Sequence, residues 1–170
     1  VNMENFNVET TSAERMIKYL EDNNIPEDKP IITLIGRLTN WKGQKLLIEA
    51  LHLLENEDFF CVMIGDDQGR KKYSAELRKM IDNYNMTDRF LFIRNVKDIP
   101  AAMMVSDVVL STSIEPEAFG RIAIEGQAMG RVVVASNIGG SVETVIDGVT
   151  GRLYESTSAK ALADAIEWAL

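Results

Sequence analysis

Strand-like and helix-like patterns alternate along this chain almost without interruption, and that alternation limits the fold more than any other feature. The strand-like segments are short, apolar and rich in β-branched residues, as buried strands are, and they cover 30–37, 59–65, 90–93, 107–113 and 131–136, with 150–155 completing the series. The helices predicted between and after them cover 45–55, 69–84, 99–106, 141–147, a stretch that includes Glu125, and the residues from Ser158 onward.

The strands are apolar throughout, so both faces of their sheet must be covered. Helices between successive strands supply that cover and make the strands parallel. We therefore predict a doubly wound, Rossmann-like α/β domain. A length of 170 residues fits one such domain, or one large half of a longer protein. Residues 1–11 show no pattern and the last helix reaches Leu170 without an end signal, so we expect a piece of a longer chain.

Composition argues against several classes of function. The net charge of −8 is unsuited to a nucleic-acid or anionic-membrane surface. The single cysteine, Cys61, leaves no internal disulfide to form, and together with the single histidine, His52, it argues against a zinc site. Cys61 lies in an apolar run, which predicts a buried thiol, and we interpret His52 as a bystander on a helix. No secretory or membrane-length apolar segment is present, so a cytoplasmic chain is expected.

Cations and a glycine follow two of the predicted strands. Ligands of open parallel sheets bind beyond the carboxyl ends of the strands. Arg37 and Lys42 lie in the loop after the first strand, and Phe119 and Gly120 lie where a helix begins after the fourth strand. Free amides at a helix N-terminus favour an anion, and glycine permits its close approach. A diphosphate held between the two loops is the natural candidate.

Two acids flank that helix start. Glu117 precedes the helix and would face the group attached to the diphosphate, whereas Glu125 lies within the helix. A fixed carboxylate suits the paired hydroxyls of a ribose or a sugar, which donate hydrogen bonds to it. A purely structural alternative stays open, in which Glu117 caps the helix and Glu125 pairs with Arg121 at i, i+4.

The run from Glu117 to Glu125 reads EAFGRIAIE, with seven residues between the acids. It resembles the donor-site motif of retaining family 4 glycosyltransferases (group 1 type), and the later run QAMGRVVVASNIGGSVETVIDGVTGRLY continues as that family does. GRLTNWKG at 36–43 is similar to the family's G-R-x-x-x-x-K-G loop, and VNMENFN is similar to the linker that enters the family's C-terminal domain. Ala118 and Arg131 replace prolines that many members have, a departure that concerns the subfamily more than the acids.

The resemblance implies a donor site for a nucleoside-diphosphate-sugar such as a UDP- or GDP-sugar. Its diphosphate would be held by two side chains and by three backbone amides, from Arg37, Lys42, Phe119, Gly120 and Arg121. No cofactor and no metal is implied, which fits the absence of a D-x-D pair and the poor supply of metal ligands.

The same resemblance gives the acids separate partners. Glu125 would bind the ribose hydroxyls and Glu117 the transferred sugar, while backbone groups near Val96, in the loop 94–98, would hold the nucleobase. Glu117 is therefore the catalytic candidate, because it would position the donor sugar.

At the level of the whole protein, the resemblance implies a two-domain GT-B hexosyltransferase. Residues 1–12 would be the interdomain linker and 13–170 the nucleotide-sugar-binding domain, with the acceptor site on an N-terminal domain absent from this chain. The chain alone is then expected to be inactive. Its partners would be the donor and its own acceptor domain, with any membrane contact, peripheral at the inner face, made through that domain. Bacterial polysaccharide or lipopolysaccharide synthesis is the expected setting.

Two other functions are compatible with such a sheet. One is a non-catalytic nucleotide-binding or regulatory module, such as a phosphoacceptor receiver domain, because Asp66 and Asp67 follow a strand. Asp66 and Asp67, followed by Gln68 and Gly69, read better as a polar turn. The other is a sugar-nucleotide epimerase, which gives no reason for the spacing of the two acids.

Overall fold

The computed structural model describes residues 2, 4–54 and 57–170. Within them one six-stranded sheet is formed by β1 (Ile31–Ile35), β2 (Phe60–Ile64), β3 (Phe90–Ile93), β4 (Val108–Ser111), β5 (Val132–Ser136) and β6 (Arg152–Tyr154). The α-helices are α1 (Ala13–Asn23), α2 (Gln44–Leu53), α3 (Lys71–Asn83), α4 (Ile99–Met104), α5 (Arg121–Ala128), α6 (Ser141–Thr144) and α7 (Ala159–Ala169). Short 3-10 turns are η1 (Val8–Thr10), η2 (Asn40–Lys42) and η3 (Thr87–Arg89).

The sheet is wholly parallel, with the strand order β3-β2-β1-β4-β5-β6. β1 lies between β2 and β4, and Leu34 of β1 pairs in register with Met63 on one side and Leu110 on the other. The chain winds outward in one direction from β1 and in the other from β4. The carboxyl ends of these two strands therefore flank the point where the direction of winding reverses, where ligands of doubly wound sheets bind.

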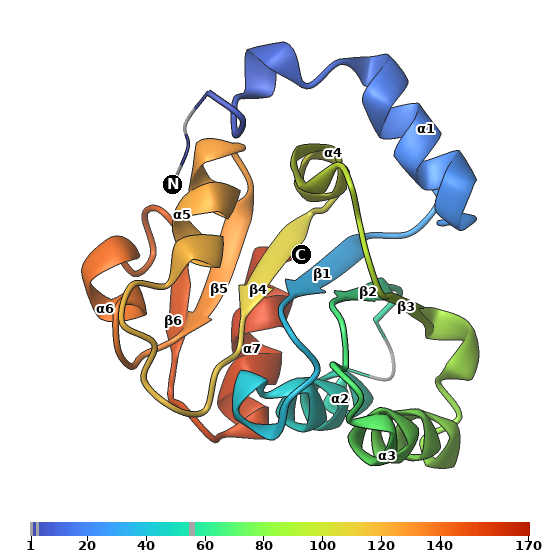
Figure 1. Cartoon of the computed structure of the whole chain (residues 1–170). Coiled ribbons are helices and arrows are strands. Elements are labelled where there is room, and N and C mark those ends of the chain that lie inside the picture. Colours follow the sequence, from blue (N-terminus) through green and yellow to red (C-terminus); the bar gives the residue numbers. More distant parts are fainter. Residues whose placement is uncertain (1, 3, 55–56) are drawn as a thin grey trace.

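Helices cover both faces of the sheet (Figure 1). On one face α2, α3 and α7 pack over a core that includes Ile32, Leu47 and Leu162, all fully buried. On the other face α1 and α4 cover one half of the sheet and α5 covers the other, where Val109 and Ala123 are fully buried. The predicted doubly wound fold with apolar strands covered on both faces is confirmed.

Two details differ from the sequence patterns. The sequence predicted no element over 13–23, where α1 forms, and α1 buries little apart from Tyr19, so its apolar pattern is weak. The helix expected over 141–147 ends at Thr144, because Val145 is extended and buried against the α5 side of the sheet. Cys61 is fully buried as predicted, and burial raises the pKa of its thiol.

An ion pair fastens α1 to the rest of the domain. Arg15 donates from Nε and Nη2 to the two carboxylate oxygens of Asp98, at 2.8 and 2.6 Å. Asp98 also caps α4 by accepting from the amide of Ala101, at 3.0 Å. The hydrogen bonds with Arg15 lower the pKa of Asp98. The pair thus fixes the start of α4, directly after the loop 94–98.

Candidate functional site

A hollow of about 530 Å³ opens beyond the carboxyl ends of β1 and β4. This volume is in the range of small-ligand sites, about 300–1,000 Å³. Its walls come from the loop after β1, the loop after β4 and the first turn of α5. They comprise Ile35, Gly36, Arg37, Trp41, Lys42, Glu117, Phe119, Gly120, Arg121 and Ile122. Six of the eight residues predicted for the site are among them, and Val96 and Glu125 are not.

The loop after β1 is tied to the loop after β4. The hydroxyl of Thr112 donates to the carbonyl of Lys42 at 2.9 Å, and the amide of Ile114 donates to the carbonyl of Trp41 at 2.8 Å. Gly43 makes this approach possible, since it has φ +75° and a Cβ there would lie 1.9 Å from the carbonyl oxygen of Thr112. The two walls of the hollow are therefore held together by backbone contacts, independently of any ligand.

Two cations line the wall that follows β1. The guanidinium carbon of Arg37 lies 5.6 Å from the ring centre of Trp41, and the ammonium of Lys42 lies 4.5 Å from it. Arg37 is exposed and takes part in no ion pair within the described residues. Its guanidinium is thus available to an anion, and Trp41 restricts where both cations lie.

The opposite wall offers backbone donors. α5 begins at Arg121, and its N-cap residue, Gly120, has φ +60° and supplies no side-chain cap. The amides of Phe119, Gly120 and Arg121 make no hydrogen bond within the described part of the chain. Unpaired amides and the positive end of a helix favour an anion in front of them.

Glu117 lies in the loop after β4 and faces Lys42. Its Oε1 accepts from Lys42 Nζ at 2.6 Å and also from the hydroxyl of Ser113. The Glu117 side chain is 24% exposed and that of Lys42 is 14% exposed, so the pair is largely removed from water. Glu117 does not cap α5, which excludes that half of the structural alternative.

Glu125 lies on α5 among apolar neighbours. It is 9% exposed, and its carboxylate has no hydrogen-bond donor and no ion pair within the described residues. Burial raises the pKa of Glu125, opposed by the positive charge of Arg121. No Arg121–Glu125 ion pair forms there, so the second half of the structural alternative fails as well.

Two further loops bear on the predictions. Val96 lines a separate hollow between α1 and the loop 94–98, and its predicted role in holding a nucleobase stays a prediction. Asp66 accepts from the amide of Gln68 and from Arg94, while Asp67 accepts from the amide of Gly69 at 3.0 Å. The polar turn is confirmed there, and Asp66 already has partners that a phosphoacceptor would have to lose.

Sequence reasoning did not single out Trp41, Ser113 or the glycine pair that supports Glu117. The amide of Gly140 donates to the carbonyl of Glu117 at 2.7 Å, and a Cβ on Gly139 would lie 2.5 Å from that oxygen. Trp41 lies within the quoted 36–43 loop and could have been noticed there. Nothing in the sequence indicates that Ser113 bonds to Glu117.

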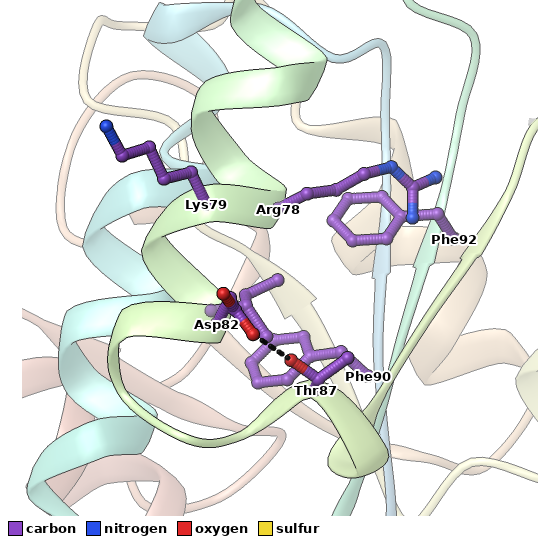
Figure 2. A pocket seen from close by; sticks show the side chains of 7 residues that line it. Arg78, Lys79, Asp82, Thr87, Phe90 and Phe92 are labelled. Atoms are coloured by element: carbon purple, nitrogen blue, oxygen red, sulfur yellow. Dashed lines mark hydrogen bonds between the residues drawn. The ribbon is translucent and has the colours of Figure 1, made fainter.

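A second hollow, of about 440 Å³, lies beside the edge strand β3 and against α3 (Figure 2). The guanidinium of Arg78 lies 4.4 Å from the ring centre of Phe92, and the hydroxyl of Thr87 donates to Asp82 at 3.4 Å. It contains none of the predicted residues and lies away from the carboxyl ends of β1 and β4. The candidate site is therefore the hollow at the switch point.

The fold and the site define a class: a doubly wound α/β domain with a hollow of cationic and amide walls at its switch point. The chain belongs to the family of glycosyl transferases group 1, whose model matches residues 16–170. Its fold is like that of the C-terminal domains of GT-B glycosyltransferases. No helix of the described residues is long and apolar enough to cross a membrane.

Individual relatives agree with this assignment. A D-inositol 3-phosphate glycosyltransferase of Xylanimonas cellulosilytica is 34% identical over 144 residues, which cover 84% of this chain and 34% of the relative. A glycosyltransferase of Rickettsia africae superposes with a TM-score of 0.96 at 39% identity, over 99% of this chain and 45% of that one. The Anabaena protein HepE in complex with UDP-glucose gives 0.89 at 30% identity, over 99% and 45%. The chain thus spans about a third of the length of the curated relatives it matches.

Proposed function

We propose that this chain is the donor-binding domain of a retaining hexosyltransferase, which moves a sugar from a nucleoside-diphosphate-sugar to an acceptor. The observation that carries the proposal is the switch-point hollow, where Arg37, Lys42 and three free amides face one another with Glu117 between them. The complex of HepE with UDP-glucose supports a nucleotide-sugar as the ligand class.

In this proposal the diphosphate lies between Arg37, Lys42 and the amides of Phe119, Gly120 and Arg121. An ammonium has three N–H donors, and Glu117 uses one of those on Lys42. The other two remain for phosphate oxygens, so Lys42 can bridge the diphosphate and the acid that contacts the sugar.

The reaction breaks the bond between the anomeric carbon and a diphosphate oxygen, and the electron pair leaves with that oxygen. The acceptor oxygen forms the new bond and loses its proton. Cations and amides fixed beforehand stabilise the charge that develops on the leaving oxygen, an effect often worth about 3–4 kcal/mol for a single donor. These groups would do so without a metal. Glu117 would position the sugar and stabilise positive charge at its anomeric carbon.

The nucleoside would extend from the hollow toward the nearby loops. Glu125 would accept hydrogen bonds from the ribose hydroxyls, because its buried carboxylate has none of its own within the described residues. Backbone groups near Val96 would hold the nucleobase. The acceptor would bind to the N-terminal domain of the whole enzyme, in the cytoplasm or at the inner face of the membrane, in bacterial envelope polysaccharide or lipopolysaccharide synthesis.

Calorimetric titration of the purified chain tests the proposal. UDP, GDP and ADP are titrated, each together with a sugar conjugate: UDP-glucose, GDP-mannose or ADP-glucose. We expect one nucleotide to bind, and the chain alone to transfer no sugar to any acceptor. If no nucleotide of the three binds, the proposal is wrong. Turnover by this chain alone would contradict the assignment of the acceptor site to another domain.

A further inference from the structure

Ser113 makes a contact that the functional assignments above leave unexplained. It is the second residue after β4 and is 3% exposed, and its hydroxyl donates to Oε1 of Glu117, four residues later. Lys42 donates to the same oxygen. Within the described residues no donor contacts Oε2 of Glu117.

These contacts make the two carboxylate oxygens of Glu117 unequal. Each oxygen of a carboxylate has about two acceptor positions, and those of Oε1 are occupied by Lys42 and Ser113. Oε2 keeps its capacity on a side chain that lines the hollow. A hydroxyl of a ligand would therefore be met by Oε2.

Lys42 alone would fix this orientation poorly. Its ammonium is carried on a flexible four-carbon stem, and the proposed function also gives it the diphosphate to hold. The hydroxyl of Ser113 is one bond from its Cβ, and the neighbouring residue, Thr112, is fastened to the loop after β1. Ser113 is thus the more rigid of the two supports.

We propose that Ser113 is a positioning residue, which holds Oε1 of Glu117 so that Oε2 accepts a hydrogen bond from a hydroxyl of the transferred sugar. The inference rests on the proposed function and adds a prediction of its own: Ser113 contributes to recognition of the sugar and not to recognition of the nucleotide.

The test compares Ser113→Ala, which removes the hydroxyl, with Ser113→Thr, which keeps it. Ser111→Ala is the matched control, since Ser111 is also buried and its hydroxyl makes no hydrogen bond within the described residues. Calorimetry gives the dissociation constants of UDP and UDP-glucose, GDP and GDP-mannose, and ADP and ADP-glucose. The comparison uses the pair that the unaltered chain binds, and thermal melts confirm that each variant is folded.

We expect Ser113→Ala to reduce the affinity gained from the sugar by about 3- to 10-fold, the effect of losing one hydrogen bond. Affinity for the nucleotide alone should stay within about twofold, as it should for both ligands in Ser111→Ala and Ser113→Thr. In a Glu117→Gln background Ser113→Ala should have no further effect, because the residue it positions is already altered.

The outcomes separate the two proposals. If the unaltered chain binds no nucleotide, the proposed function fails and this inference fails with it. If it binds a nucleotide but gains nothing from the sugar, or if Ser113→Ala keeps the full gain, the role of Ser113 is overturned while the donor site stands. An equal loss of sugar affinity in the Glu117→Gln background would also overturn it.

Discussion

Glu117 lies in a loop whose neighbours donate hydrogen bonds to it, whereas Glu125, eight residues later, lies on a helix whose neighbours do not. Lys42 and Ser113 contact the first carboxylate, and the second has no donor within the described residues. A buried carboxylate without donors is costly to the folded state. The loop has therefore satisfied its acid in advance, and the helix retains an unsatisfied acid whose cost a ligand's hydroxyls would relieve.

The two regions are also supported in different ways. The loop that carries Glu117 rests on backbone contacts with Gly139 and Gly140, where no side chain fits. On α5, a Cβ at Gly126 would meet the side chains of Val133 and Val109, at 3.0 and 3.2 Å. Backbone cannot move aside as a side chain can, so the loop should tolerate substitution less well than the helix.

The largest expected effect is that of Gly139→Ala. Its φ is +59°, and the new Cβ would lie 2.5 and 2.7 Å from backbone atoms of Glu117. We expect a loss of about 2–4 kcal/mol in the free energy of unfolding, measured by urea denaturation. Gly126→Ala is the matched control on the helix and should cost no more than about 1 kcal/mol, since alanine favours helix by a similar amount. Equal losses in both would contradict the contrast between rigid loop and yielding helix.

The next effect compares the two cations. Arg37→Ala and Lys42→Ala should each weaken nucleoside-diphosphate binding by about 10- to 150-fold, the equivalent of about 1.5–3 kcal/mol for a charge-assisted hydrogen bond. Only Lys42→Ala should also lower the unfolding free energy, by about 1–2 kcal/mol, because it deprives the partly buried Glu117 of its cation. Calorimetry and denaturation on both variants measure these changes, and unchanged affinity in both would remove the cations from the site.

A smaller effect separates the acids by ligand. Glu125→Gln should weaken binding of the free nucleoside diphosphate by about 3- to 10-fold, as the ribose loses a charged acceptor. Glu117→Gln should leave that affinity nearly intact, reduce the gain from the sugar, and lower turnover in the full-length enzyme. Titrations with nucleotide and nucleotide-sugar distinguish the two, and the same pattern of loss in both variants would contradict separate roles.

The smallest effect is on stability as a function of pH. Burial raises the pKa of Glu125 in the folded chain, so its ionisation is a penalty of the folded state. The penalty is absent below the unfolded-state pKa of about 4.3. It grows as pH rises toward the higher pKa of the folded state and then stays constant. Glu125→Gln should therefore be more stable than the unaltered chain at pH 7, by about 0.5–1 kcal/mol, and the gain should vanish near pH 4.

Denaturation of both forms at pH 4 and pH 7 measures this gain. Glu143→Gln, at an exposed position, is the matched control for the loss of a glutamate charge. A lower stability of Glu125→Gln at pH 7 would show that the carboxylate has a stabilising partner, and would remove the contrast with Glu117.

Much of the fold was determined by the sequence alone. Apolar β-branched runs need cover on both faces, and the helical segments between them leave a doubly wound sheet as the natural arrangement. β3 has the predicted bounds of 90–93, and the other strands lie inside their predicted ranges. The sequence also indicated the loops of the hollow, because cations, glycines and strand ends are local features that can be read directly.

Only the tertiary structure decided which groups meet. Lys42 and Glu117 are 75 residues apart and become neighbours because β1 and β4 are adjacent in the sheet. Strand order depends on packing across the whole sheet, which a local pattern does not encode. Likewise, the direction of the Ser113 hydroxyl and the isolation of Glu125 from any donor in the described chain are set by neighbours distant in sequence. The sequence placed both acids near a ligand, and three-dimensional packing gave one of them its hydrogen-bond donors and left the other without.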